Sequence, residues 1–199
     1  MSYRSGRYKG EKMLSELLPH FQAVGSNLYA RNMLSMHGGN MSMKFGDKIC
    51  ITCSGSRLGY LTDKDLILTS INADDENVRM ASSELAVHRA IYQKTPFAAV
   101  VHAHPIHATV MSGLTEKIMP LDEGGLLFIP EVPVVGFNVK PEPGKFSAEI
   151  SEALMDHPVV MVYRHGSFAR GTTLEEAFVI TELLEISCRM LYLEKTVSN

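Results

Sequence analysis

The chain has 199 residues, of which 45% are hydrophobic and 21% charged, and its formal net charge is -3. This length and apolar content predict one globular domain over residues 11–199, preceded by a flexible polar arm at residues 1–10. The weak negative charge argues against a nucleic-acid or membrane partner, and no apolar run reaches the roughly 18 residues of a membrane span. We therefore expect a cytoplasmic protein that acts on small molecules.

Two helices are clearest in the amphipathic pattern. Apolar residues recur at three- and four-residue steps from Glu11 to Met33, which predicts a helix that is kinked or restarted at Pro19. A C-terminal helix begins at Thr173, where the letters TLEE form a capping box before an apolar face. Further helices are expected at residues 82–93 and 146–156, and Pro105 suits the first turn of another.

Strand signals are interspersed among these helices. The segment MSMKFGDKICIT, residues 41–52, predicts a hairpin around a Gly-Asp turn. Short apolar or turn-flanked runs predict further strands at residues 66–71, 97–101, 132–137, 158–163 and 167–170. Because hairpins alternate with helical connections, the pattern favours a layered α/β domain with a largely antiparallel or mixed sheet.

Three histidines follow one of these strands, in the stretch AVVHAHPIH. In a strand, His102 and His104 point to the same side, where both imidazoles can bind one metal ion. His165 in the stretch VVMVYRHG also follows a buried strand-like run, whereas His107 falls in the next element. Two strand ends that deliver histidines to one sheet edge would leave an open coordination position, as in catalytic zinc sites.

The remaining histidines and the cysteines have plainer interpretations. His20, His37, His88 and His157 are expected on the surface or at caps. The three cysteines are expected to be reduced thiols. Cys50 and Cys53 would point to opposite faces of a strand, which disfavours shared metal ligation.

A carboxylate that could move protons stands in the segment ASSEL. Glu84 falls in the expected first turn of a helix, where an acid also complements the helix dipole. Ser82 and Ser83 in the same turn could bind an anion such as phosphate through their hydroxyls and backbone amides. Both interpretations of Glu84 remain open on the residues alone.

Two further segments could bind an anion. The loop TCSGS, which contains Ser54 and Gly55 and precedes Arg57, could form an anion nest of backbone amides. Asn40 follows two glycines and could be either a turn residue or a binding residue. Neither segment has the spacing of a nucleotide-binding fingerprint.

Taken in order, the motifs GGNMS, ITCSGS, SSE, VHAHP and RHG resemble those of the class II aldolase and adducin-like family. The resemblance extends from about Leu14 to Leu193. It implies a three-layer α/β/α sandwich around a mostly antiparallel sheet, and a homo-oligomer, usually a tetramer, with sites between subunits. By motif match it implies that Zn²⁺ or another divalent metal binds three ligands: His102, His104 and His165.

The same resemblance implies roles for the polar residues. Glu84 matches the catalytic acid/base, and the substrate phosphate would be bound by Asn40, Ser54, Gly55, Ser82 and Ser83. The implied reaction cleaves a ketose 1-phosphate, a sugar phosphate, to dihydroxyacetone phosphate and an aldehyde. The metal would act as a Lewis acid that stabilises the enediolate, and Glu84 would carry the proton.

Other activities occur on the same framework. A decarboxylase or a dehydratase of a related sugar or oxo-acid phosphate is one alternative. A non-catalytic adducin-like binding module is another, although such modules have lost the histidines, whereas this chain keeps all three and Glu84. The type aldolases have a tyrosine between the second and third histidines, which protonates the departing alkoxide. This chain has none between Tyr92 and Tyr163, so Asp122 or Glu123 is a candidate for that role.

Overall fold

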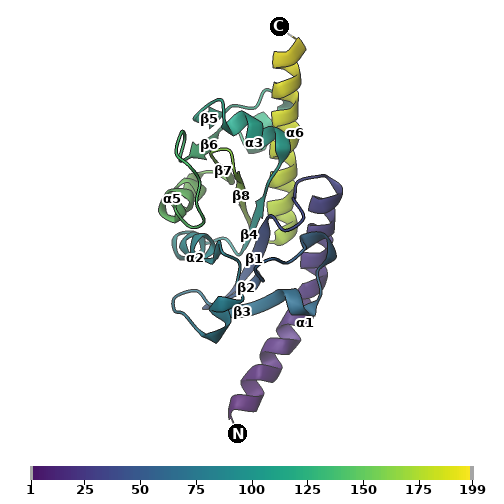
Figure 1. Cartoon of the computed structure of the whole chain (residues 1–199), viewed down its shortest axis with the longest axis vertical. Helices are drawn as coiled ribbons and strands as arrows, with labels where there is room; N and C mark the ends of the chain where they lie inside the picture. The colour runs from purple at the N-terminus through teal and green to yellow at the C-terminus, as the bar shows by residue number, and fades with distance from the viewer. Residues whose placement is uncertain (1, 198–199) are drawn as a thin grey trace.

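The computed structural model describes residues 2–197, with side chains from residue 12 onward. This part of the chain has an α/β fold in which helices flank a mixed sheet (Figure 1). The sheet order is β3-β2-β1-β4-β8-β7-β6-β5. The strand bounds are β1 (Asn40–Phe45), β2 (Lys48–Thr52), β3 (Leu66–Ser70), β4 (Ala99–Ala103), β5 (Lys117–Ile118), β6 (Val132–Val135), β7 (Val159–Val162) and β8 (Gly166–Gly171). The α/β class predicted from the sequence is confirmed.

Strand β4 lies in the middle of the sheet, between β1 and β8. Both neighbours run antiparallel to it, with Asn40 opposite His102 and Ser167 opposite Ala103. The predicted hairpin of β1 and β2 is present, and β6 pairs with β7 in parallel, which makes the sheet mixed. This register brings the start of β1, the end of β4 and the start of β8 side by side at one end of the sheet.

The helices differ from the sequence prediction mainly at their ends. Their bounds are α1 (Ser2–Ala30), α2 (Leu85–Lys94), α3 (Ile106–Ser112), α4 (Glu123–Phe128), α5 (Ser147–Asp156) and α6 (Leu174–Val197). Helix α1 runs through Pro19 without a break and begins nine residues before the predicted start. The backbone of residues 2–10 therefore belongs to this helix, while the side chains of the predicted arm lie outside the described residues.

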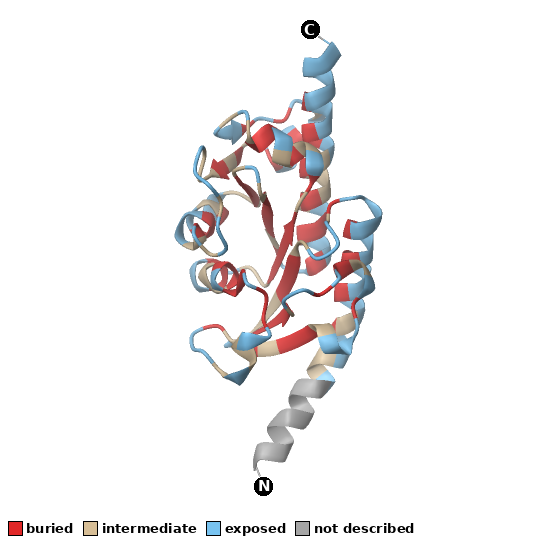
Figure 2. Ribbon diagram, viewed as in Figure 1, coloured by how far each residue is buried: buried red, intermediate tan, exposed pale blue. Residues whose placement is uncertain are grey.

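The two faces of the sheet are covered by different helices. Helices α1 and α6 lie on one side, and α2 and α5 on the other (Figure 1). Along β4 the buried side chains alternate: Val101 joins the core with α1 and α6, and Val100 joins the core with α2 and α5. Figure 2 shows buried residues along the strands and on the inner sides of the helices. The central strands of the sheet are therefore buried on both faces.

The sequence patterns missed two short elements between β4 and β6. Strand β5 has only two residues, and α4 contains two glycines, so neither produces a recognisable period. Helix α2 begins at Leu85 rather than at the predicted Ser82, because Ser82 to Glu84 form a turn before it. No helix within residues 2–197 combines the length and the apolar character needed to cross a bilayer.

Candidate metal centre and active site

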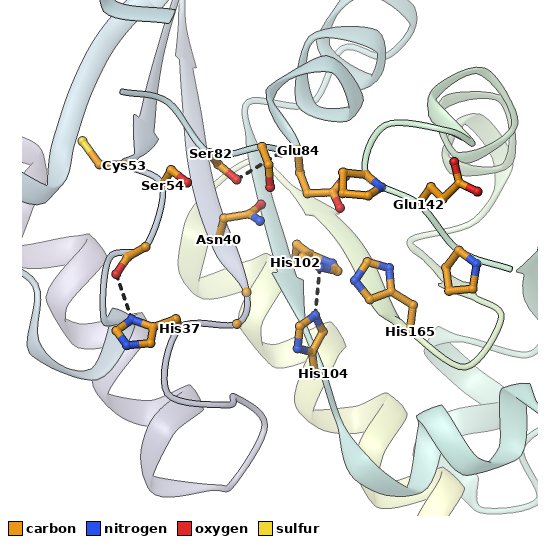
Figure 3. Close-up of a pocket in the computed structure, with 16 residues that line it drawn as sticks. His37, Asn40, Cys53, Ser54, Ser82, Glu84, His102, His104, Glu142 and His165 are labelled. Carbon is orange, nitrogen blue, oxygen red and sulfur yellow. Dashed lines mark hydrogen bonds between the residues drawn. The ribbon is translucent and has the colours of Figure 1, made fainter. Parts of the chain in front are cut away.

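Three histidines converge at the end of the sheet where β4 finishes and β8 begins. One ring nitrogen each from His102, His104 and His165 lies within 4.8 Å of the other two. The ring centroids are 4.8, 5.0 and 5.1 Å apart, and Figure 3 shows the rings gathered at one place. The structure thus brings together the three predicted ligands, and within the described residues no other such cluster of ligating side chains occurs.

Local backbone geometry fixes the second and third histidines. The His104 amide donates to the Met33 carbonyl at 2.8 Å, which holds the chain just beyond the end of β4. His165 lies in the turn between β7 and β8, after Arg164 in the left-handed region at φ +51°. A Cβ added to Gly166 would lie 2.5 Å from the His104 ring, so only glycine allows this close approach. The RHG motif is therefore explained by packing against the histidine pair.

The protonation states of these rings suit a cation. The Nδ1–H of His102 donates to the Ser167 carbonyl at 2.9 Å, which leaves the lone pair on Nε2. His104 Nε2 lies 3.1 Å from that atom. Burial lowers the pKa of His102 well below its usual range, with smaller contributions from the other two histidines, and burial lowers the pKa of His104 to about 4. Neutral imidazoles, each with one unprotonated ring nitrogen, fit a divalent ion.

Glu84 faces the histidines across the same cavity. It is the residue before α2, and its side chain makes no capping hydrogen bond to that helix. The side chain is 6% exposed, and burial raises the pKa of its carboxyl. Its Oε2 accepts a hydrogen bond from the Gly144 amide at 3.3 Å, which opposes part of that shift. A buried carboxyl with a raised pKa is suited to taking and returning a proton.

The predicted anion-binding residues line the other part of this cavity, whose volume is about 280 Å³. They are Asn40, Ser54, Gly55, Ser82 and Ser83. Two hydrogen bonds hold the segments together: Ser54 N–H donates to Met80 O at 2.8 Å, and Ser82 N–H donates to Thr52 O at 3.1 Å. Among the described residues that line the cavity none is a lysine or arginine, so an anion there would be bound by neutral donors.

The start of β1 is held close to the histidine strand by a glycine. Gly39 has φ +85°, and a Cβ there would lie 2.8 Å from the His102 carbonyl oxygen. Only glycine adopts this conformation and this approach without strain. The Gly-Gly pair of the GGN motif therefore lets Asn40 begin a strand directly beside His102, and Asn40 is a binding candidate rather than a simple turn residue.

Sequence comparison identifies the family. Residues 20–192 match the family model described as "Class II Aldolase and Adducin N-terminal domain". The chain belongs to the class II aldolase and adducin family. L-fuculose phosphate aldolase from Methanocaldococcus jannaschii is 29% identical over 181 residues, which cover 90% of this chain and 97% of that protein.

Two crystal structures place the fold within the same family. L-fuculose-1-phosphate aldolase from Thermus thermophilus superimposes with a TM-score of 0.84 at 31% identity, over 92% of this chain and 96% of that one. YgbL from Klebsiella pneumoniae, described as an aldolase, epimerase or decarboxylase, superimposes with a TM-score of 0.79 at 26% identity, over 92% and 90% of the two chains. The family resemblance inferred from the motifs is confirmed.

Three residues that the sequence suggested for this class II aldolase site do not line the cavity. Asp122 and Glu123 do not line the cavity; Asp122 instead caps α4 by accepting from the Gly125 amide at 2.9 Å. The Arg57 guanidinium lies over the Tyr60 ring rather than in the cavity. Neither residue that the sequence suggested for alkoxide protonation therefore lies in the cavity of this chain.

Other residues of the cavity were missed by the sequence interpretation. His37, which was expected at the surface, lines the cavity while its Nδ1–H donates to the Gly55 carbonyl at 2.9 Å. Cys53 and Glu142 also line it, and Glu142 comes from the connector between β6 and α5. No local signal distinguishes these residues, because they reach the cavity only through tertiary folding. Cys50 and Cys53 pack in different cores, as expected.

Proposed function

We propose that this class II aldolase family member is a divalent-metal-dependent lyase that cleaves a ketose 1-phosphate to dihydroxyacetone phosphate and an aldehyde. The observation that carries this proposal is the convergence of three neutral histidines, one buried carboxyl and a set of neutral anion donors on one cavity. None of these groups alone would define a reaction. Together they supply a metal site, a proton carrier and a phosphate site within one small volume.

His102, His104 and His165 would bind the metal, which we propose to be Zn²⁺ or another divalent ion. Three nitrogen ligands with an open position are typical of catalytic zinc sites. When bound, such an ion supplies Lewis-acid polarisation of the substrate's carbonyl and hydroxyl oxygens. The Ser167 carbonyl keeps His102 in the tautomer that presents Nε2, so this hydrogen bond prepares the ligand before the ion arrives.

Glu84 would move the proton during carbon-carbon cleavage. The Gly144 amide engages Oε2, and we assign proton transfer to the other oxygen, Oε1. Glu84 would take the proton of the hydroxyl on the carbon that becomes the aldehyde and return it to the carbanionic carbon of the other product, and burial favours the protonated carboxyl between these two transfers. Its position across the cavity from the histidines leaves room for the reacting carbons between them.

The substrate phosphate would be bound at the anion end of the cavity by Asn40, Ser54, Gly55, Ser82 and Ser83. Hydroxyl and backbone donors bind phosphate without a fixed cation when the amides point at it. Binding the phosphate away from the reacting carbons positions the sugar, and this remote binding energy lowers the barrier at the metal. The backbone bridge between the two anion-binding segments supports this arrangement.

A second candidate is a decarboxylase or dehydratase of a related sugar or oxo-acid phosphate on the same site. It is favoured by one observation: among the described residues that line the cavity there is no tyrosine to exchange a proton with the oxygen of the departing aldehyde. Both reactions would still use the histidines and Glu84. The structural similarity to YgbL, described as an aldolase, epimerase or decarboxylase, supports keeping this candidate.

We also propose the finer organisation of the family for this chain. It comprises one domain over residues 11–199, a three-layer α/β/α sandwich with a mostly antiparallel sheet, and a cytoplasmic homo-oligomer, with a tetramer as the expected form. Support for subunit contacts comes from exposed apolar side chains around α4: Met119, Leu121, Leu126, Leu127 and Phe128. The three cysteines are free thiols, which suits a reducing compartment.

The test is a screen for retro-aldol cleavage of ketose 1-phosphates, including L-fuculose 1-phosphate, by metal-loaded protein with coupled detection of dihydroxyacetone phosphate. Release of this product that requires the metal is the expected result. No release, together with carbon dioxide release from an oxo-acid phosphate, would replace the aldolase with the decarboxylase. Inactivity on all phosphates by protein that contains the ion would favour the binding module.

A further inference from the structure

A buried histidine that the proposed mechanism does not use lies behind the cavity. His88 is in the middle of α2, and its side chain is fully buried. The sequence predicted a surface or capping role for it, and this prediction is wrong. Its Nε2 lies 2.5 Å from Asn40 Oδ1 and its Nδ1 lies 2.6 Å from Ser42 Oγ, so both ring nitrogens have polar partners.

The hydrogen bonds continue beyond His88 to a tyrosine. The Tyr92 hydroxyl lies 2.7 Å from Ser42 Oγ and 2.9 Å from the Ser42 carbonyl oxygen, so its single proton is shared between these two acceptors. Asn40 and Ser42 are two residues apart in β1, and His88 and Tyr92 are four apart in α2. Two residues along a strand, and four along a helix, face the same side. The polar residues of α2 therefore face the polar residues of β1, inside an otherwise apolar layer.

The direction of these hydrogen bonds follows from the chemistry of the partners. Burial lowers the pKa of His88 to about 3, so the ring is neutral and carries one proton. The amide oxygen of Asn40 only accepts, which puts that proton on Nε2. Nδ1 must then accept from the Ser42 hydroxyl. With its oxygen held against His88, the Asn40 amide turns its NH₂ group away from the ring.

Asn40 also belongs to the cavity. Asn40 lines the cavity at the start of β1, opposite His102 in the sheet register. Figure 3 shows the Asn40 amide between Ser82 and the histidines. We propose that His88, Ser42 and Tyr92 are positioning residues that fix the Asn40 amide so that its two N–H donors face an anionic oxygen of the substrate. This inference rests on the proposed function for the identity of the anion as a sugar phosphate.

A reversed Asn40 amide is incompatible with this tautomer of His88. The NH₂ group of Asn40 would meet the Nε2–H of His88, donor against donor, and the amide oxygen would face the anion. The tautomer of His88 therefore reports the orientation of the Asn40 amide, because a reversed amide would require the ring proton on Nδ1 instead. A purely structural role would predict loss of stability alone, with anion affinity unchanged in any variant that still folds.

The test combines a spectroscopic measurement with binding of inorganic phosphate. In wild-type protein labelled with ¹⁵N-histidine, we expect His88 to be protonated at Nε2 and unprotonated at Nδ1. For His88→Leu, isothermal titration calorimetry of the metal-loaded protein should give about tenfold weaker phosphate binding, the equivalent of one lost hydrogen bond. His88→Gln keeps a donor near the Nε2 position and should weaken binding less. All variants should retain the wild-type metal content.

Two smaller substitutions test the chain if His88→Leu does not fold. Ser42→Ala and Tyr92→Phe should each weaken phosphate binding, whereas Ser151→Ala, which removes an equally buried serine hydroxyl in α5, should not. In the background of Asn40→Ala, these substitutions should have no further effect on phosphate affinity, because the group that they position is gone.

Three results would overturn the inference: the opposite His88 tautomer, unchanged phosphate affinity in the folded variants, or no phosphate binding by the wild-type protein. Failure of the proposed reaction gives a different pattern. In that case ketose phosphates are not cleaved, but the tautomer and the dependence of phosphate affinity on His88 are as predicted.

Discussion

The two ends of the cavity are built in different ways. The histidine end is formed by β4 and the turn between β7 and β8, where His102 is nearly fully buried and sheet pairing fixes the backbone. The anion end is formed by the start of β1 and by loops, and its Ser54 and Ser83 are exposed. A rigid strand end is suited to precise ligand geometry, and a loop is suited to adapting to different substrates. This difference predicts that chemistry depends on the histidine end and substrate choice on the anion end.

Loss of a histidine ligand should have the largest effect. His102→Ala removes the most buried ligand, so the protein should lose its bound ion and its activity should fall to background. This loss exceeds the about 10- to 100-fold effect of removing a second-layer partner. Elemental analysis checks the ion content. His107→Ala is the matched control, because His107 contacts Glu185 on α6 and should leave ion and activity intact. An ion retained by His102→Ala would contradict the ligand assignment.

Loss of the proton carrier should separate chemistry from metal binding at the same end. Glu84→Gln keeps the size of the side chain but cannot carry the proton, so turnover should fall by about 10²- to 10⁴-fold. The metal content should equal that of the wild type, since the carboxyl is not a ligand in this account. The measurement is kcat by product release beside elemental analysis. Near-normal turnover would remove Glu84 from the reaction.

A change at the anion end should affect binding rather than chemistry. Ser54→Ala removes one neutral donor to the phosphate, so KM should rise by about tenfold, as expected for about 1.4 kcal/mol, with kcat little changed. Ser15→Ala, an exposed serine of α1, serves as control. A fall in kcat with constant KM would contradict the assignment of substrate binding to the anion end and chemistry to the histidine end.

The buried histidines should make stability depend on pH. Burial lowers the pKa of His88 to about 3 and that of His104 to about 4, compared with about 6.5 in the unfolded chain. Below about pH 6.5 the unfolded chain therefore binds more protons than the folded one, so stability is full above that pH and is lost as the pH falls. Each group contributes at most about 1.4 kcal/mol per pH unit.

Urea unfolding of the metal-free protein at pH 7.5, 6 and 5 measures this dependence. The free energy of unfolding should fall with pH, and less steeply in His88→Gln than in the wild type. A wild-type value that stays constant or rises toward pH 5 would contradict the burial of neutral rings.

The sequence predicts the histidine end well because local rules determine it. Strand alternation puts His102 and His104 on one side, and the strand-like run before His165 places that residue near a sheet edge. What the residues alone left open was whether two separate strand ends meet. The sheet order answers this, because β4 and β8 are neighbours.

The anion end and the positioning chain are harder to predict because they depend on tertiary contacts. His88 looks like an ordinary helix residue, and only the packing of α2 against β1 brings it to Asn40. Glu84 was expected inside a helix, yet it precedes one and turns toward the cavity. Asp122 was suggested by its place in the chain, but the fold uses it to cap α4.

The most direct test of the central claim is a crystal structure of the zinc-loaded protein with anomalous data collected at the zinc edge. We predict one strong peak, at about 2.0 to 2.1 Å from a nitrogen of each of His102, His104 and His165. A zinc peak only at another position, or no peak between these three rings in protein saturated with zinc, would contradict the account.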